Sequence, residues 1–433
     1  MNHADTLAGL GVMIPDVLLP VEGTDLERWA VVACDQYTSQ PEYWDEAEAF
    51  VGEAPSTLRL VFPEVHLHEP EPERRIAAIN EAMRDYDERG LFRTLPGTLV
   101  LVRRETGAGD LRWGVMVALD LEAYDYSPGS RSLVRATEGT ILDRIPPRKR
   151  VRAEAPLELP HILVLISDPD LTVIEPLVAA VDSYTPLYDT ALMADGGQVT
   201  GWAVDEAHLA GFADALAALH AGLDPENPLL FAMGDGNHSL ATAKSCWEDV
   251  RATLGEDDRA THPARYALVE IENIFDPGLE FEPIHRVLLG TTREDFETEL
   301  AKHCGSYEAE AVPDLDTLLA ALDTATVQSF GFADGDELEV YVLEDPAASI
   351  AAGTLQKVID GLVAVGHQVD YIHGADVTAE LAEAEGTLGL FLPGVPKETF
   401  FASVVADGAL PRKTFSLGEA ADKRYYLEAR RIR

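Results

Sequence analysis

The chain has few lysines, and positive charge is scarce along most of its length. Only seven of its 433 residues are lysine, and 33 basic residues stand against 76 acidic ones, which gives a formal net charge of −43. Nucleic acids and anionic membranes bind proteins through broad positive surfaces. The charge therefore excludes nucleic acid and membrane lipid as expected partners, and it favours a highly soluble protein.

Cysteine and long apolar runs are also scarce. Cys34, Cys246 and Cys304 lie far apart without a C-x-x-C pair, which excludes a disulfide framework and a cysteine-based zinc site. No run reaches the roughly 18 apolar residues of a membrane helix. The N-terminal residues lack the basic stretch of a signal peptide. We expect a cytoplasmic protein, and the sequence leaves its oligomeric state open.

What the chain does contain is a succession of strand-like and helical patterns. Two apolar runs at 98–105 and 112–121 enclose a Gly-rich turn and predict a β-hairpin. We further predict helices at 205–222 and 239–254, and strands at 161–167, 229–233, 265–274 and 281–289. Residues 293–345 predict helix, strand, helix and hairpin, and residues 353–407 alternate helix and strand. Several antiparallel pairs favour an α+β fold of mixed, largely antiparallel sheets with flanking helices.

Two basic islands interrupt the acidic chain. Residues 131–152 contain seven basic residues against two acids, and residues 410–433 contain seven against three. The islands either pair with the protein's own carboxylates or converge on a bound phosphate or carboxylate, for which arginine offers bidentate contacts. The sequence leaves both interpretations open.

The segment G-D-G-N-H-S at 234–239 carries the clearest chemical signal. It joins a predicted strand to a predicted helix, which presents backbone N–H groups to an anion. Asp235 and His238 are candidate catalytic residues, and Asp235 is also a candidate metal ligand. Candidate ligand contacts are Gly234, Gly236, Asn237, Ser239 and Thr242. The alternative is a tight turn in which His238 caps the helix, because the segment matches neither a P-loop nor a dinucleotide fingerprint.

Seven segments carry a resemblance that runs almost from end to end. They are W-A-V-V-A-C-D-Q-Y-T-S-Q-P at 29–41, R-A-T-E-G-T at 135–140, R-I-P-P-R at 144–148, E-L-P-H at 158–161, G-D-G-N-H-S-L-A-T-A-K at 234–244, F-E-P-I-H-R at 281–286 and L-P-R-K-T-F-S at 410–416. On these segments the chain is identified as a member of a bacterial and archaeal family of unknown function, DUF1015.

The 234–239 turn is also similar to the D-G-x-H-R turn of the ParB/sulfiredoxin-like superfamily, whose members bind nucleotide phosphates there and include kinases of free serine. The resemblance implies a ParB/sulfiredoxin-like core, ATP or ADP with Mg²⁺ as cofactors, and a phosphorylated small molecule or nucleotide as partner. Ser239 stands where the superfamily has arginine. One phosphate contact must then come from elsewhere, and Arg135, Arg148 and Lys413 are the candidates.

Glu138, inside the first basic island, is our leading candidate for a catalytic base or a magnesium ligand, with a salt-bridged strand residue as the alternative. In the second island, Arg412, Lys413 and Ser416 are candidate phosphate contacts. Asp35 follows an apolar run at 29–33, predicted as a strand, and is expected near the same pocket.

The remaining candidates have structural alternatives. Cys34 is predicted to be a packed side chain rather than a nucleophile. His161 and His285 border apolar runs, where a hydrogen-bonded structural histidine is commoner than a ligand. His66 and His68 alternate in a predicted strand and suit a metal ion only with a third ligand.

Together these features predict a phosphate-ester or phosphotransfer enzyme that acts on serine, phosphoserine or a similar metabolite. The alternative function is a non-catalytic sensor that binds a nucleotide or phosphorylated metabolite linked to serine metabolism. Three domains are expected: a phosphate- or nucleotide-binding catalytic region at 1–290, a smaller α/β domain at 291–409 and a basic tail at 410–433 that packs back on the site.

Overall fold

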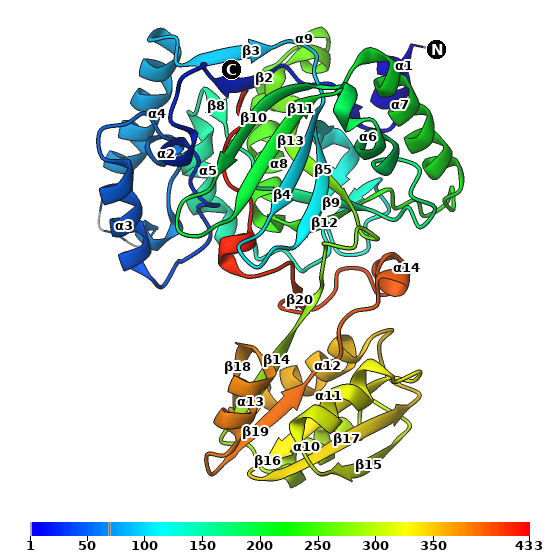
Figure 1. Cartoon of the computed structure of the whole chain (residues 1–433). Helices are drawn as coiled ribbons and strands as arrows, with labels where there is room; N and C mark the ends of the chain where they lie inside the picture. The colour runs from blue at the N-terminus through cyan, green and yellow to red at the C-terminus, as the bar shows by residue number, and fades with distance from the viewer. Residues whose placement is uncertain (1, 68, 70) are drawn as a thin grey trace. The chain divides into compact units, whose positions relative to one another are not determined.

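The computed structural model describes residues 2–67, 69 and 71–433. It divides into a larger unit, residues 1–280 with 417–433, and a smaller unit, residues 281–416 (Figure 1). The chain leaves the larger unit after Glu280 and returns to it at Leu417. The basic tail expected at 410–433 is thus divided between the two units.

A ten-stranded sheet organises the described part of the larger unit. Its order is β10-β11-β4-β5-β13-β9-β12-β7-β6, and β1 pairs with β5. The strands are β1 (Val12–Met13), β4 (Val100–Glu105), β5 (Leu111–Asp120), β6 (Tyr124–Asp125), β7 (Val134–Arg135), β9 (Leu163–Ile166), β10 (Thr185–Ala191), β11 (Gln198–Ala203), β12 (Phe231–Asp235) and β13 (Tyr266–Asn273). Three pairs, β13 with β9, β12 with β7 and β7 with β6, are parallel, and the other pairs are antiparallel.

The β4–β5 hairpin is the one predicted from the sequence, and its alternating side chains build two cores. Leu101 and Val115 face one apolar cluster, which also receives buried side chains of the helices on that side. Val100 and Met116 face the opposite cluster. This alternation follows from the two-residue period of a strand, since both faces of the sheet are covered.

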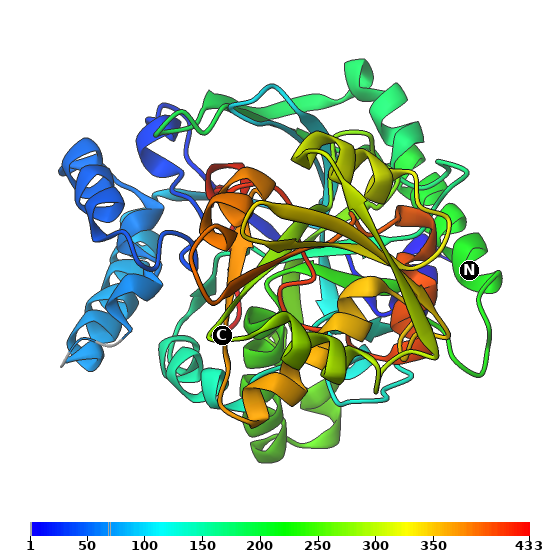
Figure 2. The same cartoon turned by 90° about the horizontal axis from the view of Figure 1, so that it is seen from below.

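Helices cover the sheet of the larger unit. They are α1 (His3–Gly9), α2 (Leu26–Trp29), α3 (Pro41–Val51), α4 (Pro72–Glu88), α5 (Ile145–Ala153), α6 (Glu175–Ala179), α7 (Glu206–Ala221), α8 (Asn237–Thr253) and α9 (Glu256–Thr261). Leu209 and Phe212 of α7 and Trp247 of α8 belong to the first core. In both views α3 and α4 stand at one edge of the unit (Figure 2).

The predicted strand at 29–33 is wrong. Trp29 ends the short helix α2, which begins because the Asp25 side chain accepts a hydrogen bond from the Arg28 N–H. The chain is then extended, and Val32 forms an isolated bridge with Tyr425. The apolar side chains of this run are buried in the second apolar cluster, although the run is not part of a sheet.

The returning segment 417–433 is buried along much of its length. Its strand β21 (Arg430–Arg431) pairs with β8 (Leu157–Glu158), and a separate two-stranded sheet joins β2 (Val17–Pro20) to β3 (Phe92–Leu95). Arg424 forms ion pairs with Glu270 and Glu428, and Arg430 Nε lies 2.7 Å from Glu158 Oε1. For these arginines of the second basic island, pairing with the protein's own carboxylates is confirmed.

The smaller unit contains an antiparallel sheet in the order β15-β17-β16-β19-β14-β18, with β20 also paired to β14. Its strands are β14 (Glu282–Leu289), β15 (Ser306–Val312), β16 (Ser329–Asp334), β17 (Glu337–Glu344), β18 (Gln368–His373), β19 (Thr387–Phe391) and β20 (Phe415–Ser416). Its helices are α10 (Arg293–Leu300), α11 (Leu315–Asp323), α12 (Ala351–Ala364), α13 (Ala375–Ala382) and α14 (Lys397–Asp407). Phe296, Phe330, Phe332 and Tyr341 form the centre of its core.

The predicted fold class is confirmed, since both units combine largely antiparallel sheets with flanking helices. Within the described residues, no helix has the length and apolar character needed to cross a membrane. His66 lies in a short 3₁₀ helix, Glu64–His66, and not in the strand predicted for it, and His68 lies outside the described residues.

Candidate functional site

The start of α8 is the centre of the candidate site in the larger unit. Strand β12 ends at Asp235, and Gly236 follows with φ of +79°, in the left-handed region that glycine favours. A Cβ at this position would lie 3.1 Å from Ile162 Cα, so glycine also permits the close approach. The N-cap residue of α8 is Gly236, which has no side chain with which to cap the helix. Because first-turn N–H groups have no acceptor within a helix, this end of α8 can receive a ligand oxygen.

The segment 137–141 lies against the first turn of α8. The Thr137 N–H donates to Asn237 Oδ1 at 3.2 Å, and the Thr137 hydroxyl donates to the Met233 carbonyl at 2.6 Å. The Ile141 N–H donates to His238 Nε2 at 3.2 Å. Asn237 and His238 therefore position a loop that carries Glu138, which is half-buried between these two anchors.

His161 lies on the other side of the same turn. Its Nε2 is 2.7 Å from Ser239 Oγ, and its Nδ1 is 2.8 Å from the Tyr426 hydroxyl. Asp35 Oδ2 lies 3.7 Å from the same Nε2. Asp35, Tyr426 and Ser239, the third residue of α8, thus meet around His161 from distant parts of the sequence.

Ser239 and His161 line a cavity of about 150 Å³. One wall is apolar and is formed by Leu60, Val61, Phe62, Met83, Val151 and Leu157. Cys34, Glu64, Arg148 and Tyr426 add polar groups. Burial raises the pKa of the Cys34 thiol, which supports its predicted role as a packed side chain rather than a nucleophile.

Asp235 is held in its charged form by its neighbours. Burial alone would raise the pKa of its carboxyl group, but Lys423, the Gly236 N–H and His161 lower that pKa below its usual value. Lys423 Nζ lies 3.3 Å from Asp235 Oδ2, and the Gly236 N–H donates to Oδ1 at 2.7 Å. The carboxylate of Asp235 in the turn and the ammonium group of Lys423 therefore lie side by side.

The two arginines proposed from the first island have different surroundings. Arg148 on α5 lines the cavity and forms an ion pair with Glu64, whose pKa is raised by burial in spite of that partner. Arg135 at the end of β7 donates to the carbonyls of Ser132 and Pro228, at 2.9 and 2.5 Å. The structure therefore brings Arg148, and not the Arg135 guanidinium, to the cavity.

The other predicted site residues fall into two groups. Gly234 lies in β12, and the Thr242 hydroxyl on α8 donates to the His238 carbonyl at 2.7 Å. Arg412, Lys413 and Ser416 belong to the smaller unit, where Ser416 is part of β20. Their predicted phosphate contacts, and the predicted packing of the whole basic tail 410–433 on the site, stay predictions.

Two residues of this region were not among the sequence candidates. Lys423 stands beside Asp235, and Tyr426 bonds to His161, 265 positions away in the chain. The second basic island contains Lys423, so its charge was a usable signal. Nothing in the local pattern around Tyr426 indicates its contact.

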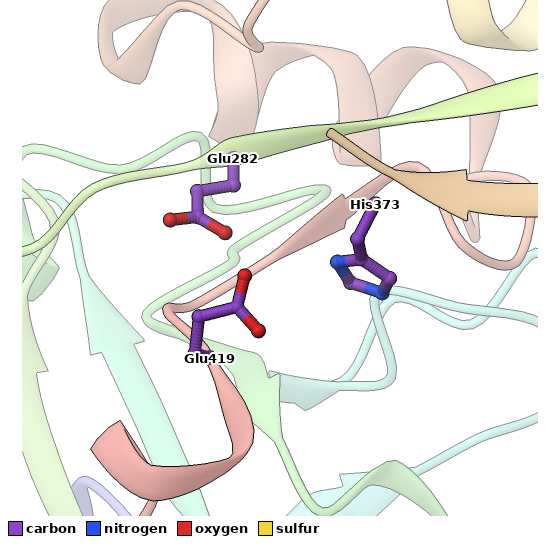
Figure 3. Close-up of side chains that lie close together, drawn as sticks. All are labelled: Glu282, His373 and Glu419. Carbon is purple, nitrogen blue, oxygen red and sulfur yellow. The ribbon is translucent and has the colours of Figure 1, made fainter. Parts of the chain in front are cut away.

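The carboxylates of the candidate site do not form a ready-made metal centre. Neither Glu138 nor Asp235 belongs to a group of three ligating side chains in the described part of the chain. Figure 3 shows Glu282 and His373, from the neighbouring strands β14 and β18 of the smaller unit, together with Glu419 of the larger unit. We assign no metal site to these three, because they belong to different units.

Similar solved structures include a free serine kinase in complex with AMP, at 10% identity and a TM-score of 0.38, covering 73% of this chain and 92% of that chain. A conserved hypothetical protein from Pyrococcus furiosus has 12% identity, a TM-score of 0.34 and coverage of 72% and 90%. SbnI from Staphylococcus aureus, with a C-terminal truncation, has 10% identity, a TM-score of 0.36 and coverage of 70% and 81%. Likeness at this level assigns no activity to the chain.

No curated protein matches the sequence. The family described as "Protein of unknown function (DUF1015)" matches residues 18–362. This range contains the start of α8 and the loop with Glu138, and it covers most of the chain. The chain belongs to the DUF1015 family.

Proposed function

We propose that the larger unit is a phosphate-ester or phosphotransfer enzyme that acts on serine, phosphoserine or a similar small metabolite. One observation carries the proposal. The loop 137–141, His161 and Lys423 all converge on the start of α8, a helix without a side-chain cap. An uncapped helix start with nearby cations favours binding of an anion. Phosphate is the anion we propose, because the 234–239 turn is similar to a turn that binds nucleotide phosphates in the ParB/sulfiredoxin-like superfamily.

The charges around the turn suit phosphate chemistry. Lys423 and the helix start stabilise negative charge that develops on a phosphoryl group. We assign proton transfer to the carboxylates of Asp235 and Glu138, and His238 positions the loop that carries Glu138. Arg148 is the arginine we place next to the phosphate, since Arg135 is occupied by backbone carbonyls.

Magnesium and a nucleotide are proposed as cofactors. Mg²⁺ is commonly held by one or two carboxylates together with substrate phosphates, rather than by a cage of protein ligands. Asp235 and Glu138 fit that arrangement, and the absence of a three-ligand group around either, within the described residues, argues against an all-protein site. When bound, the metal would neutralise phosphate charge beside Lys423.

The proposal is tested first by binding. Thermal unfolding is measured with ATP, ADP, AMP, pyrophosphate, serine and phosphoserine, each with and without Mg²⁺. A ligand that binds only the folded protein raises the melting temperature. We expect a phosphorylated compound to stabilise the wild-type chain, the His238→Ala variant to lose that shift, and the His220→Ala variant, with its substitution on α7, to keep it.

Turnover is tested next with the ligand identified in this way. We expect Glu138→Gln to bind that ligand but to lose turnover by about 100-fold or more. Binding by wild type with no chemical change over hours would instead indicate the sensor. If no compound of the panel shifts the melting temperature, the proposal is wrong.

A further inference from the structure

Four groups of the larger unit form a chain of hydrogen bonds whose direction can be deduced. The Cys34 backbone N–H points at the Tyr426 hydroxyl oxygen at 3.0 Å, and that oxygen lies 2.8 Å from His161 Nδ1. A backbone N–H can only donate, so the Tyr426 oxygen accepts from Cys34, and we assign the hydrogen of the phenol to Nδ1, the ring nitrogen 2.8 Å away. Burial raises the pKa of Tyr426 well above its usual value, so the phenol retains this hydrogen.

The tautomer of His161 follows from this direction. Because Nδ1 accepts a hydrogen from Tyr426, the hydrogen of the neutral imidazole lies on Nε2. Nε2 then donates to Ser239 Oγ, 2.7 Å away. Ser239 is left with its own hydroxyl hydrogen, and its side chain lines the cavity. In this state His161 is not a base toward Ser239, since a base must accept the hydroxyl hydrogen.

Asp35 places a negative charge next to this donor. Its Oδ1 accepts from the Gln36 side chain at 3.0 Å, and its Oδ2 lies 3.7 Å from His161 Nε2. Its side chain is 25% exposed, and within the described residues no lysine or arginine forms an ion pair with it. The neighbouring Glu64, in contrast, is paired with Arg148. Asp35 lies at the edge of the cavity, next to the lining residues Cys34 and His161, and unlike Glu64 it has no arginine or lysine partner among the described residues.

We infer that Asp35 and Ser239 together select a small amino compound as the substrate of the proposed enzyme. Asp35 accepts hydrogen bonds from the ammonium group of the substrate, and Ser239 donates its hydroxyl hydrogen to an oxygen of the substrate's anionic group. His161 and Tyr426 are positioning residues that fix the direction of the Ser239 hydroxyl. This inference rests on the proposed function, because it assumes that the ligand also carries a phosphate or carboxylate.

The size of the cavity points to the same class of substrate. A cavity of about 150 Å³ holds a molecule of about the size of benzene. The serine part of a ligand is about this size, whereas the base and sugar of a nucleotide are too large for it. A nucleotide therefore binds outside this cavity.

The test compares two ligands that differ at one group. Phosphoserine carries an ammonium group where 3-phosphoglycerate carries a hydroxyl. Calorimetric titration of the full-length protein should show phosphoserine binding about tenfold tighter or more, as expected for a hydrogen bond between charged groups. Asp35→Asn should remove the preference by weakening phosphoserine alone. Asp45→Asn, on the exposed side of α3, is the matched control and should bind as wild type does.

The outcomes separate this inference from the proposed function. Equal binding of both ligands by wild type, unchanged in Asp35→Asn, would overturn the role of Asp35 and leave the phosphate site standing. If neither ligand binds to wild type, the proposed function fails, and this inference fails with it. Loss of binding for both ligands in Asp35→Asn, with an unchanged melting temperature, would also contradict a role specific to the ammonium group.

The tautomer is tested without any ligand. Long-range ¹H–¹⁵N spectra of protein labelled with ¹⁵N-histidine distinguish Nε2–H from Nδ1–H, and His161→Gln identifies the His161 signal. We expect Nε2–H in wild type and a mixture of tautomers in Tyr426→Phe, a change that loss of packing alone would not produce. An Nδ1–H tautomer in wild type would reverse the direction of the chain and overturn the donor role of Ser239.

Discussion

The two units use buried charge differently. In the larger unit, Arg424 is almost fully buried between Glu270 and Glu428. In the smaller unit, the fully buried Arg286 lies over the Tyr371 ring, Arg293 reaches three acids from a partly exposed position, and the centre of the core is a group of aromatic rings. Burying ions costs free energy that their mutual attraction recovers only with good geometry. Charge burial in the larger unit therefore needs an explanation beyond stability.

The path of the segment 417–433 supplies that explanation. Arg424 and Arg430 each pair with specific buried glutamates, and this fixes one position for the segment that contains them. The same segment carries Lys423 to Asp235 and Tyr426 to His161. The comparison indicates that the larger unit gives up stability to position its candidate site.

The largest effect is expected from removing one buried charge. Arg424→Met leaves Glu270 and Glu428 buried without their partner, which should lower the free energy of unfolding by about 3–5 kcal/mol. All five tryptophans lie in the larger unit, so their fluorescence during urea unfolding reports on that unit. The matched control is Arg431→Met, since the Arg431–Asp87 pair is exposed and should contribute about 1 kcal/mol or less.

The same variants test the positioning argument. Arg424→Met should displace Tyr426 and therefore disturb the His161 signals, whereas Arg431→Met should leave them unchanged. A cost of less than about 1 kcal/mol for Arg424→Met would contradict this account, because the buried charges would then have no structural consequence.

An effect of intermediate size is expected from pH. In the smaller unit, burial, together with Arg286 and His373, lowers the pKa of His285 to about 4. In the unfolded chain this histidine binds its proton near pH 6.5. The free energy of unfolding of the smaller unit is therefore highest above pH 6.5 and should fall by about 3 kcal/mol as the pH is lowered from 6.5 to 4. Hydrogen exchange in β14 at pH 7 and pH 5, corrected for intrinsic rates, should show this loss. His285→Gln, which keeps an acceptor for the Leu392 N–H, should remove it.

The larger unit should respond to the same pH change in the opposite direction. Burial raises the pKa of Glu272 to about 8 in spite of Arg112, whose Nε lies 3.0 Å away. The folded unit then binds a proton that the unfolded chain releases above about pH 4.5, so it gains stability as pH falls from 8 toward 4.5. Burial would also raise the pKa of Glu158, but Arg430 and Arg152 bring that pKa below its usual value. The stability that the charged Glu158 contributes is therefore lost only below about pH 4.5. Parallel destabilisation of both units between pH 6.5 and 5 would contradict this difference.

Local patterns in the sequence predicted much of the fold. The hairpin at 98–121 and the strand that leads into α8 follow from apolar periodicity and turn residues within a few positions. The strand predicted at 29–33 was wrong. Within this run Val32 pairs with Tyr425, which lies far along the chain, and no local pattern indicates that partner.

The candidate site was predictable to a lesser extent for the same reason. The glycines of the 234–239 segment predicted its turn, but Ser239 and Asp235 contact residues that lie far away in the chain. Composition alone also failed to separate the two interpretations of the basic islands. Whether an arginine meets a carboxylate of its own chain depends on long-range packing, as Arg430 and Glu158 illustrate.

The smallest effect concerns how the helices begin. In the smaller unit, Thr292 and Asp295 form a capping box at the start of α10, whereas α8 in the larger unit has no side-chain cap. Thr292→Ala should lower the free energy of unfolding of the smaller unit by about 1 kcal/mol. The exposed Thr298→Ala, within the same helix, is the control and should raise it by a few tenths of a kcal/mol. Hydrogen exchange of residues 293–300 measures both.

Adding phosphate tests the difference between the starts of α8 and α10. A helix that already has its cap gains little from an anion, whereas an uncapped start gains the hydrogen bonds that a cap would have supplied. Phosphate should therefore slow hydrogen exchange in the first turns of α8 and leave the capped α10 of wild type unchanged. In Thr292→Ala we also expect no protection of α10, because Glu294 and Asp295 in its first turn repel the anion, whereas the first turn of α8 contains no acid. If phosphate protects α10 of Thr292→Ala as strongly as α8, any uncapped helix attracts the anion. The proposal of a specific phosphate site at the start of α8 would then be wrong.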